Sequence, residues 1–553
     1  MAPSLLATID LEVIADPGAR QAIQGLLNLV EQLVAENRAL REDNQRLRDE
    51  NNRLKGERGT PTFAPSKRAA AGPDYSSERE RRQPGSWQKG SKLDRVTVTR
   101  TERLAVDPAD LPSDAEYKGL ETVVVQDLRL EVDGICFEKE VWYSPSQRRS
   151  YRAPLPAGYD GAFGPGLKAL ALALHYGANV TQPKLRELFE QAGVVLSSGY
   201  LADLLSRDRA GFAAEATAVF QAGLSSSPWQ HLDETRTRVD GQPEHCHVVG
   251  NPLYTAYVTT PRKDRLTVLD VLRGGTARRF RLDAVAERYL DWVGLSASAR
   301  RRLASWPREQ ELDEATVTGL LDAQRLWLGP QQRTWILEAL ALAAYQAQNA
   351  WPVVQTLVCD DAPQFRGVTD ELALCWIHEG RHYTKLSPYL PQHQALLAEF
   401  KGRFWAYYRE LLAYRERPSA DERTRLDAAF DALFATETGY RLLDQRIALT
   451  RTKKDGLLLV LEHPELPLHN NPAELAARRR VRKRDASFGP RSSDGRTAWD
   501  TFHTLAATAQ QLGVSFYGYL RDRLTGHGQF PRLADLITER AHSLSLGASW
   551  AAS

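Results

Sequence analysis

Residues 227–260 read SPWQHLDETRTRVDGQPEHCHVVGNPLYTAYVTT, and this stretch decides the fold. Apolar and polar residues alternate in it over three successive segments, and polar turn residues separate them, including Asp240 and Gly241. Alternation with a period of two is typical of β-strands that bury one face, and Asp-Gly favours a tight hairpin turn. The stretch therefore predicts an antiparallel meander.

More strands follow after a mainly helical stretch near 276–350. The segment PVVQTLVCDDAPQF (352–365) is an apolar run that ends in two acids, and ELALCWIHEG (371–380) is another short apolar segment. Strands before and after helices indicate a mixed α/β core. The chain divides into an N-terminal helix (1–55), a flexible basic linker (56–93), a small β module with a hairpin turn at Asp133-Gly134 (94–160), a helical region (161–222), the first part of the core (223–380), a helical insertion (381–466) and the last part of the core (467–553). The region at 161–222 resembles a helix-turn-helix unit and is expected to bind DNA; a plain helical connector is the alternative.

The N-terminal helix carries a leucine-zipper pattern. Leucine recurs at every seventh position, and asparagine occupies three of the intervening core positions: Leu26, Leu33, Leu40, Leu47 and Leu54, with Asn37, Asn44 and Asn51. Leucine in one core position and asparagine in the other favours a parallel two-stranded coiled coil, because each buried Asn can pair with its counterpart. We expect self-association through these five leucines; a single amphipathic helix lying on its own domain is the alternative.

Composition limits the classes of protein that fit. Of 553 residues, 42% are hydrophobic and four are cysteines, too few for a disulfide framework in so long a chain. No apolar run is long enough to span a membrane and no signal peptide is evident, so a cytoplasmic protein is expected. The 72 Lys and Arg against 70 Asp and Glu give a net charge of only +2, so any attraction to nucleic acid must come from local patches.

Three acids lie at predicted element boundaries. Asp233 sits in the first strand of the meander, Asp360 closes the strand TLVC, and Glu474 opens the final helix. Carboxylates that converge from distant segments are the ligands that hard divalent metals require. Each acid also has a simpler explanation: a strand-end Asp is usually a turn or cap residue, and Asn471, Pro472 and Glu474 fit a capping box at a helix start.

The order and surroundings of these acids add a resemblance. The blocks that carry it are HLDETRTRVDG (231–241), CDDAPQF (359–365), ALCWIHEGRHY (373–383) and HNNPAELAARRRVRKRDASFGPRSSDGRTAWDTFHTLAATAQQLGVSFYGYLRDRL (469–524). Together they resemble the insertion-sequence-66 family of DDE transposases. The resemblance implies an RNase H-like catalytic core with helical insertions, and two Mg²⁺ or Mn²⁺ ions bound by Asp233, Asp360 and Glu474. Asp361 is the alternative to Asp360 as the second metal-binding acid. Family members often carry a cysteine zinc element before the helical region, where this sequence has only Cys136.

A basic run follows the third acid. It contains Arg478, Arg479, Arg480, Arg482, Lys483 and Arg484. Such a run is suited to neutralising phosphates without reading sequence, so we expect these residues to contact DNA; a solvated helix face is the alternative.

Cys375, His378 and His382 have a spacing that can hold zinc at a strand-to-helix turn, but no fourth ligand is evident. A packed Cys with structural or DNA-facing histidines is the favoured interpretation.

The resemblance, with these acids and the basic run, therefore implies a bacterial, nucleoid-associated transposase. It would cut and join DNA at the terminal inverted repeats of an insertion sequence and insert them into target DNA by metal-dependent phosphoryl transfer, acting as a dimer or larger oligomer. Whether accessory transposition proteins are needed is left open. The alternatives are a nuclease on the same core that does not join strands, and a catalytically inactive dimeric DNA-binding protein.

Overall fold

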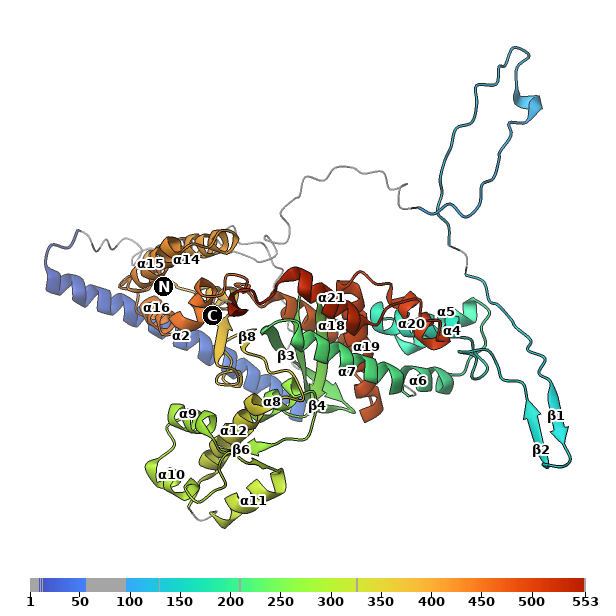
Figure 1. Ribbon diagram of the computed structural model, residues 1–553. Helices are drawn as coiled ribbons and strands as arrows, with labels where there is room; N and C mark the ends of the chain where they lie inside the picture. The colour runs from blue at the N-terminus through green and yellow to red at the C-terminus, as the bar shows by residue number, and fades with distance from the viewer. Residues whose placement is uncertain are drawn as a thin grey trace.

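The computed structural model describes residues 9, 11, 13–55, 96–128, 130–207, 210–324 and 327–551. The predicted linker at 56–93 lies outside the described residues. Within them the chain is a mixed α/β protein, with a central sheet flanked by helices and two outlying helical groups (Figure 1). No helix among the described residues has the length and apolar character needed to cross a membrane.

The central sheet contains the predicted meander. Its strands run in the order β5-β4-β3-β8-β9, in which β3, β4 and β5 are antiparallel neighbours and β8 and β9 are parallel to β3. The turn between the first two strands is formed by Asp240 (φ 49°) and Gly241 (φ 73°), the left-handed pair that a tight hairpin requires. The strands are β3 (Trp229–Val239), β4 (Gln242–Asn251), β5 (Tyr254–Thr260), β8 (Thr356–Cys359) and β9 (Glu371–Leu374).

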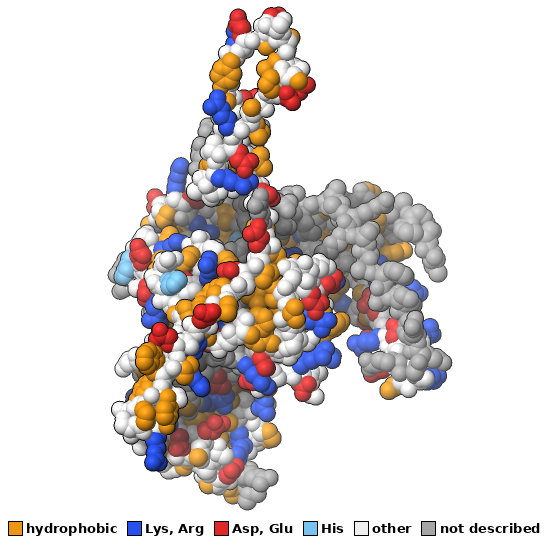
Figure 2. Space-filling view, turned by 90° about the vertical axis from the view of Figure 1, so that its right-hand side faces the viewer, with side chains coloured by type: hydrophobic (Ala, Val, Ile, Leu, Met, Phe, Trp, Pro, Cys, Tyr) orange, Lys and Arg blue, Asp and Glu red, His pale blue; other side chains and the backbone are white. Residues whose placement is uncertain are grey.

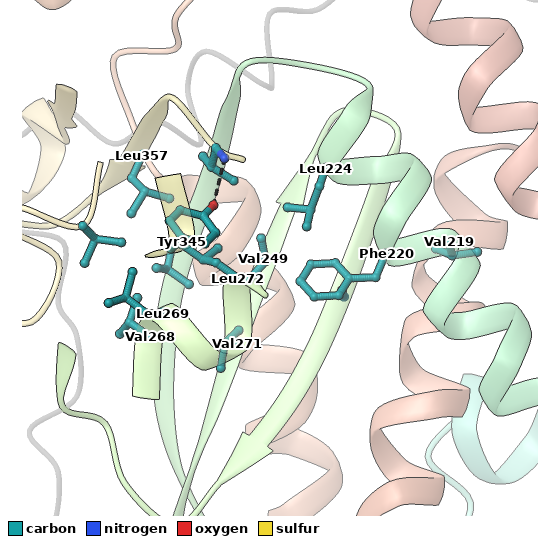
Figure 3. Packing of buried hydrophobic residues seen from close by; sticks show 14 of the residues in the cluster. Val219, Phe220, Leu224, Val249, Val268, Leu269, Val271, Leu272, Tyr345 and Leu357 are labelled. Carbon is teal, nitrogen blue, oxygen red and sulfur yellow. Dashed lines mark hydrogen bonds between the residues drawn. The ribbon is translucent and has the colours of Figure 1, made fainter. Parts of the chain in front are cut away.

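Helices cover both faces of the sheet. On one face the alanines of α18 (Asn471–Ser487) pack against Cys246, Val248 and Tyr257, and α19 (Ser493–Gln511) lies along β5. Small side chains let this helix approach the strands closely. On the other face Val249 contacts a large apolar cluster from α7 (Ala210–Ser225), α8 (Arg265–Leu272) and α12 (Pro330–Ala347) (Figure 3).

That cluster fixes the position of β8 beside β3. In Figure 3, Phe220 and Leu224 of α7 approach the sheet, and Leu357 of β8 lies near Tyr345 of α12. The Tyr345 hydroxyl accepts a hydrogen bond of 2.8 Å from the backbone N–H of Val354, just before β8 begins. The strand that leads to Asp360 is therefore held by apolar packing and by one buried hydrogen bond.

The stretch at 276–350 is mainly helical, as the sequence predicts. It contains a small two-stranded antiparallel sheet as well, and each short helix begins after an Asp or Ser whose side chain caps it. The elements are β6 (Phe280–Arg281), α9 (Ala284–Trp292), α10 (Ala297–Leu303), β7 (Glu311–Leu312) and α11 (Glu314–Ala323).

The insertion after β9 is helical, also as predicted. Its interior is aromatic: Trp376 lies against Phe404, Tyr408 and Phe430. The elements are α13 (Trp376–Lys385), α14 (Pro391–Glu416), α15 (Ala420–Phe434), α16 (Arg441–Arg451), α17 (Lys454–Leu458) and η4 (Leu459–Leu461).

The N-terminal segment forms one long helix, α2 (Pro17–Leu54). It packs on the helical insertion through Leu27 and Glu31, and the Glu31 carboxylate accepts hydrogen bonds from the backbone N–H groups of Tyr389 and Leu390 at the start of α14. The zipper leucines lie on another side of the helix, where each is at least 55% exposed: Leu26, Leu33, Leu40, Leu47 and Leu54. The helix is thus anchored on one side while its leucine stripe stays uncovered.

The segment at 94–160 differs from the prediction. Its hairpin is formed by β1 (Val141–Ser144) and β2 (Arg149–Arg152), and the described residues around Asp133-Gly134 contain no strand. The described part also contains η2 (Pro108–Asp110) and projects from the body of the molecule with its hydrophobic side chains exposed (Figures 1 and 2). The alternating pattern there has no second layer to pack on, and such a layer is what stabilises isolated strands.

The region at 161–222 is helical, as expected. A glycine with positive φ, Gly193 (φ 87°), makes the turn between α5 and α6. This region contains α4 (Pro165–Leu172), η3 (Ala173–Gly177), α5 (Gln182–Gln191), α6 (Ser198–Ser206) and most of α7. The elements at the C-terminal end of the chain are α20 (Phe516–Thr525), α21 (Leu533–Leu544) and η5 (Ser549–Ala551).

Candidate functional site

The first two predicted acids lie side by side at one end of the sheet. In the parallel pairing of β3 with β8, Trp229 is opposite Thr356 and His231 is opposite Val358. Continuing this register by two residues puts Asp233 beside Asp360. Because side chains alternate between faces with a period of two, both carboxyl groups point to the face that α18 covers.

Asp233 lies in a largely buried, negatively charged environment. The pKa of its carboxyl group is raised to about 7, mainly by burial and also by the charges of Asp360 and Glu474, while a hydrogen bond of 2.8 Å from the backbone N–H of Glu234 opposes this rise. A buried carboxyl group near two other acids favours the protonated form unless a cation is bound. The three predicted acids therefore interact, although they come from segments more than a hundred residues apart in the sequence.

The third acid is positioned by Asn470, a residue that the sequence analysis did not single out. Its side chain donates a 2.7 Å hydrogen bond to the carbonyl of Leu232 and contacts His231 Nδ1 at 2.9 Å. This ties the start of α18 directly to β3. In the sequence, this role is indicated by the three polar residues His-Asn-Asn before Pro472. A helix cap requires only one such residue.

The capping-box explanation of Glu474 is wrong in this structure. The N-cap is Asn470 rather than Asn471, and the Glu474 carboxylate does not return to the cap backbone. Instead, its Oε2 accepts a 3.0 Å hydrogen bond from Arg381 Nη2, and its Oε1 lies 3.6 Å from His378 Nδ1. The carboxylate is turned toward α13, away from its own helix start.

His378 and Arg381 are therefore site residues that the sequence analysis did not assign to Glu474. They lie three residues apart on α13, and Arg381 Nη1 also contacts His378 Nε2 at 3.1 Å. The signal was the spacing of Cys375, His378 and Arg381, which places all three on one face of a helix.

Asp360 and Asp361 have different surroundings. Asp361 accepts a 2.8 Å hydrogen bond from Arg366 Nε, and its other oxygen forms a 2.8 Å ion pair with Lys453. Asp360 accepts one 3.2 Å hydrogen bond from the backbone N–H of Ala362 and interacts electrostatically with Asp233. Asp361 is thus already neutralised by two cations, which leaves Asp360 as the acid that faces the cluster.

A cavity of about 490 Å³ opens beside Asp360. Its walls combine acids with more numerous bases, and Arg381 is exposed at its edge. The charged lining residues are Asp360, Asp361, Glu379, Arg381, Lys385, Arg446 and Lys453.

The predicted basic run on α18 divides into exposed and buried residues. Arg478, Arg479 and Arg482 are exposed, whereas Arg480 and Lys483 are buried, with Arg480 only 1% exposed. The helix packs on the sheet, and its period of 3.6 residues turns some members of the run inward. The prediction that Arg480 and Lys483 contact DNA is therefore wrong for this structure.

The buried members of the run have structural partners. Arg480 forms a 2.8 Å ion pair with Asp500. Lys483 donates a 2.7 Å hydrogen bond to the carbonyl of His175, and burial together with the charge of Arg480 lowers its pKa to about 7. Arg484 is half-buried and donates a 2.6 Å hydrogen bond to the carbonyl of Arg236.

The possible zinc ligands are only partly brought together. Cys375 and His378 lie close to each other, but the third group near them is Glu474 and not His382. Cys375 is the N-cap of α13, and burial raises the pKa of its thiol to about 11, against the effect of nearby backbone N–H groups.

Comparisons with known proteins give one relative. No sequence profile of a known family matches the chain, and no solved structure matches it. An uncharacterized protein of Sinorhizobium fredii, y4jO, is 32% identical over 324 residues, which are 58% of this chain and all of that protein. Such identity over the full length of the relative is sufficient to establish common ancestry, so the chain belongs to the same family as y4jO of Sinorhizobium fredii.

Proposed function

We propose that this protein is a DDE transposase that cuts and joins DNA by metal-dependent phosphoryl transfer. The observation that carries the proposal is the electrostatic interaction of Asp233, at one end of the mixed sheet, with both Asp360 and Glu474. These are the acids that the resemblance to the insertion-sequence-66 family selects. The sheet, an antiparallel meander with two further parallel strands, also supports an RNase H-like core.

The charge of the site fits divalent cations. The pKa of Asp233 is raised to about 7, and the charges of Asp360 and Glu474 contribute to this rise. A cation bound between these carboxylates would offset their repulsion, which supports the proposal. Mg²⁺ or Mn²⁺ held by the three acids would activate the attacking hydroxyl group and stabilise the leaving oxygen.

Residues of the chain itself have four tasks in this proposal. Asn470 fixes the start of α18 on β3, and Arg381 holds the Glu474 carboxylate from the opposite side, with His378 3.6 Å away. The exposed arginines of α18 then follow Glu474 along the helix and can neutralise the phosphates of a bound DNA strand. Joining two element ends requires an oligomer, for which the uncovered leucine stripe of α2 offers a self-complementary surface.

The test of the proposal uses the full-length protein with Mg²⁺ and a labelled duplex. The duplex carries the inverted repeats that flank the gene, and a target plasmid is added; products are resolved on a denaturing gel. We expect cleaved and joined products with the wild type. In Glu474→Gln both should fall to background because the third carboxylate is removed, while DNA binding remains.

Other outcomes of this experiment exclude the proposal. Cleavage without joining would indicate a nuclease. DNA retention without any cleavage, in the wild type as in the variant, would indicate a catalytically inactive binding protein.

Stability in the absence of metal gives a second prediction, which needs no DNA substrate. The folded-state pKa of Asp233, about 7, lies above the unfolded value of 3.8, so the folded protein binds more protons between these pH values. Asp233 therefore lowers the free energy of unfolding as pH rises from about 4 to 7, by up to ~1.4 kcal/mol per pH unit. In EDTA at pH 8, Asp233→Asn should raise the free energy of unfolding by ~2–4 kcal/mol.

The measurement is chemical denaturation at pH 5 and pH 8, with EDTA or Mg²⁺. Mg²⁺ should stabilise the wild type at pH 8 and have little effect on Asp233→Asn, because the metal can bind only the ionised cluster. Destabilisation of the variant in EDTA at pH 8 would show instead that Asp233 is a structural acceptor for the N–H of Glu234.

A further inference from the structure

A second donor set adjoins the acidic cluster and contains sulfur and nitrogen as well as oxygen. The ligand atoms of Cys375, His378 and Glu474 all lie within 4.8 Å of one another. The sulfur and the imidazole come from the first turn of α13, in a Cys-x-x-His spacing, and the carboxylate comes from the first turn of α18. Two helix starts therefore converge on this point.

The two atoms that face each other there form no hydrogen bond with any described residue. His378 Nδ1 and Glu474 Oε1 are both buried, and neither has a hydrogen-bond partner in the described part of the chain. They are 3.6 Å apart. Two ligands at about 2.0–2.1 Å from a tetrahedral zinc ion lie about 3.3 Å from each other, so only a small shift is needed for both to bind one ion.

The sulfur and the other carboxylate oxygen already have outer contacts. Cys375 Sγ accepts a 3.3 Å hydrogen bond from the backbone N–H of Asn470, and Glu474 Oε2 is held by Arg381 at 3.0 Å. Hydrogen bonds to metal-bound ligands orient them and are a regular feature of metal sites. Cys375 and Glu474 are thus already oriented by hydrogen bonds of the kind that surrounds metal ligands.

We propose that Cys375, His378 and Glu474 form a binding site for a zinc-class divalent cation. Thiolate and imidazole ligands favour such ions over Mg²⁺, and three protein ligands leave one position for water. On binding, the Cys375 thiol releases its proton to solvent, and the His378 proton moves from Nδ1 to Nε2. Arg381 must then leave His378 Nε2, but it can keep its contact with Glu474 Oε2.

The site shares Glu474 with the acidic cluster. A zinc-class ion bound to Cys375 and His378 draws this carboxylate away from Asp233 and Asp360. The ion is therefore an inhibitor of DNA cleavage, a consequence that rests on the proposed function. The binding itself does not depend on that function.

The test of binding is a Co²⁺ titration of the full-length protein in Mg²⁺ buffer. Tetrahedral Co²⁺ bound to a thiolate gives a near-ultraviolet charge-transfer band, which we expect at one equivalent. The band should disappear in Cys375→Ser, and Co²⁺ should bind His378→Gln at least roughly tenfold more weakly. Cys136→Ser and His382→Gln are the matched controls and should behave as the wild type. Circular dichroism and thermal melting check that each variant is folded.

The band has a specific interpretation because the other set of possible metal ligands among the described residues, Glu371, Glu462 and His463, contains no sulfur. A wild type without the band, or a band that persists in folded Cys375→Ser, would overturn the proposal. Zn²⁺ added at constant Mg²⁺ should inhibit cleavage by the wild type, and should inhibit Cys375→Ser less when each is compared with its own zinc-free activity. If no protein cleaves DNA, the function fails and the cobalt band alone decides the metal site.

Discussion

Asp360→Asn is expected to lose DNA cleavage by roughly a thousandfold or more, whereas Asp361→Asn stays within about tenfold of the wild type. The two residues are adjacent, but only Asp360 continues the register that places it beside Asp233. Asp361 is instead bound by Arg366 and Lys453. An amide at position 360 removes a charge from the cluster, and an amide at position 361 removes only partly exposed ion pairs with Arg366 and Lys453.

This pair of variants is measured by the initial rate of cleavage of the labelled duplex in Mg²⁺, with DNA affinity determined separately. Both variants should bind DNA as the wild type does. Each is isosteric and lies next to the other, so a general effect on folding would act on both. A larger loss in Asp361→Asn than in Asp360→Asn would exchange their roles and would contradict the register argument.

Local pattern was sufficient for the elements that build the site. The alternation around Asp233 and the Asp240-Gly241 turn predicted the meander, and the apolar run before Asp360 predicted β8. These succeed because each strand buries at least one face, so the sequence period follows the structure. The pattern near Asp133-Gly134 failed because alternation marks a strand only when another layer covers it, and this segment has none.

Contacts between distant segments could not be read from pattern. Nothing in the local sequence shows that Arg381 reaches Glu474, or that Asn470 reaches the backbone of β3. These contacts depend on how α13 and α18 lie against the sheet. The same holds for the basic run, where only packing decides which arginines face inward.

Substitutions in the basic run give the second large expected effect. Arg480 should act on the stability of the fold, and its neighbour Arg479 should act on DNA binding. Arg480 is buried, forms a 2.8 Å ion pair with Asp500 and lies over the ring of Trp499, while Arg479 is exposed. Removing one partner of a buried ion pair leaves the other charge without compensation. We expect Arg480→Met to lower the free energy of unfolding by ~3–5 kcal/mol, and Arg479→Gln to change it by no more than about 0.5 kcal/mol.

In DNA binding, Arg479→Gln should have the larger effect and Arg480→Met the smaller one. Arg479→Gln should reduce the slope of log affinity against log salt concentration by about one, because one phosphate contact and its released counterion are lost. Arg480→Met, studied at a temperature where it remains folded, should keep the wild-type slope. A loss of slope in Arg480→Met, with stability unchanged, would mean that Arg480 turns outward to meet DNA.

The expected loss of stability in Arg480→Met can be tested further through its partner, Asp500. Burial raises the pKa of this carboxyl group, and Arg480 and Thr259 lower it. Without Arg480 the pKa rises further above the unfolded value, so Arg480→Met should regain stability as pH falls and more of Asp500 is protonated. The double variant Arg480→Met, Asp500→Asn should recover part of the loss at pH 8, because no buried charge then lacks a partner. Arg480 and Glu474 lie on the same helix, α18. The ion pair between Arg480 and Asp500 therefore also stabilises the position of Glu474 relative to the sheet.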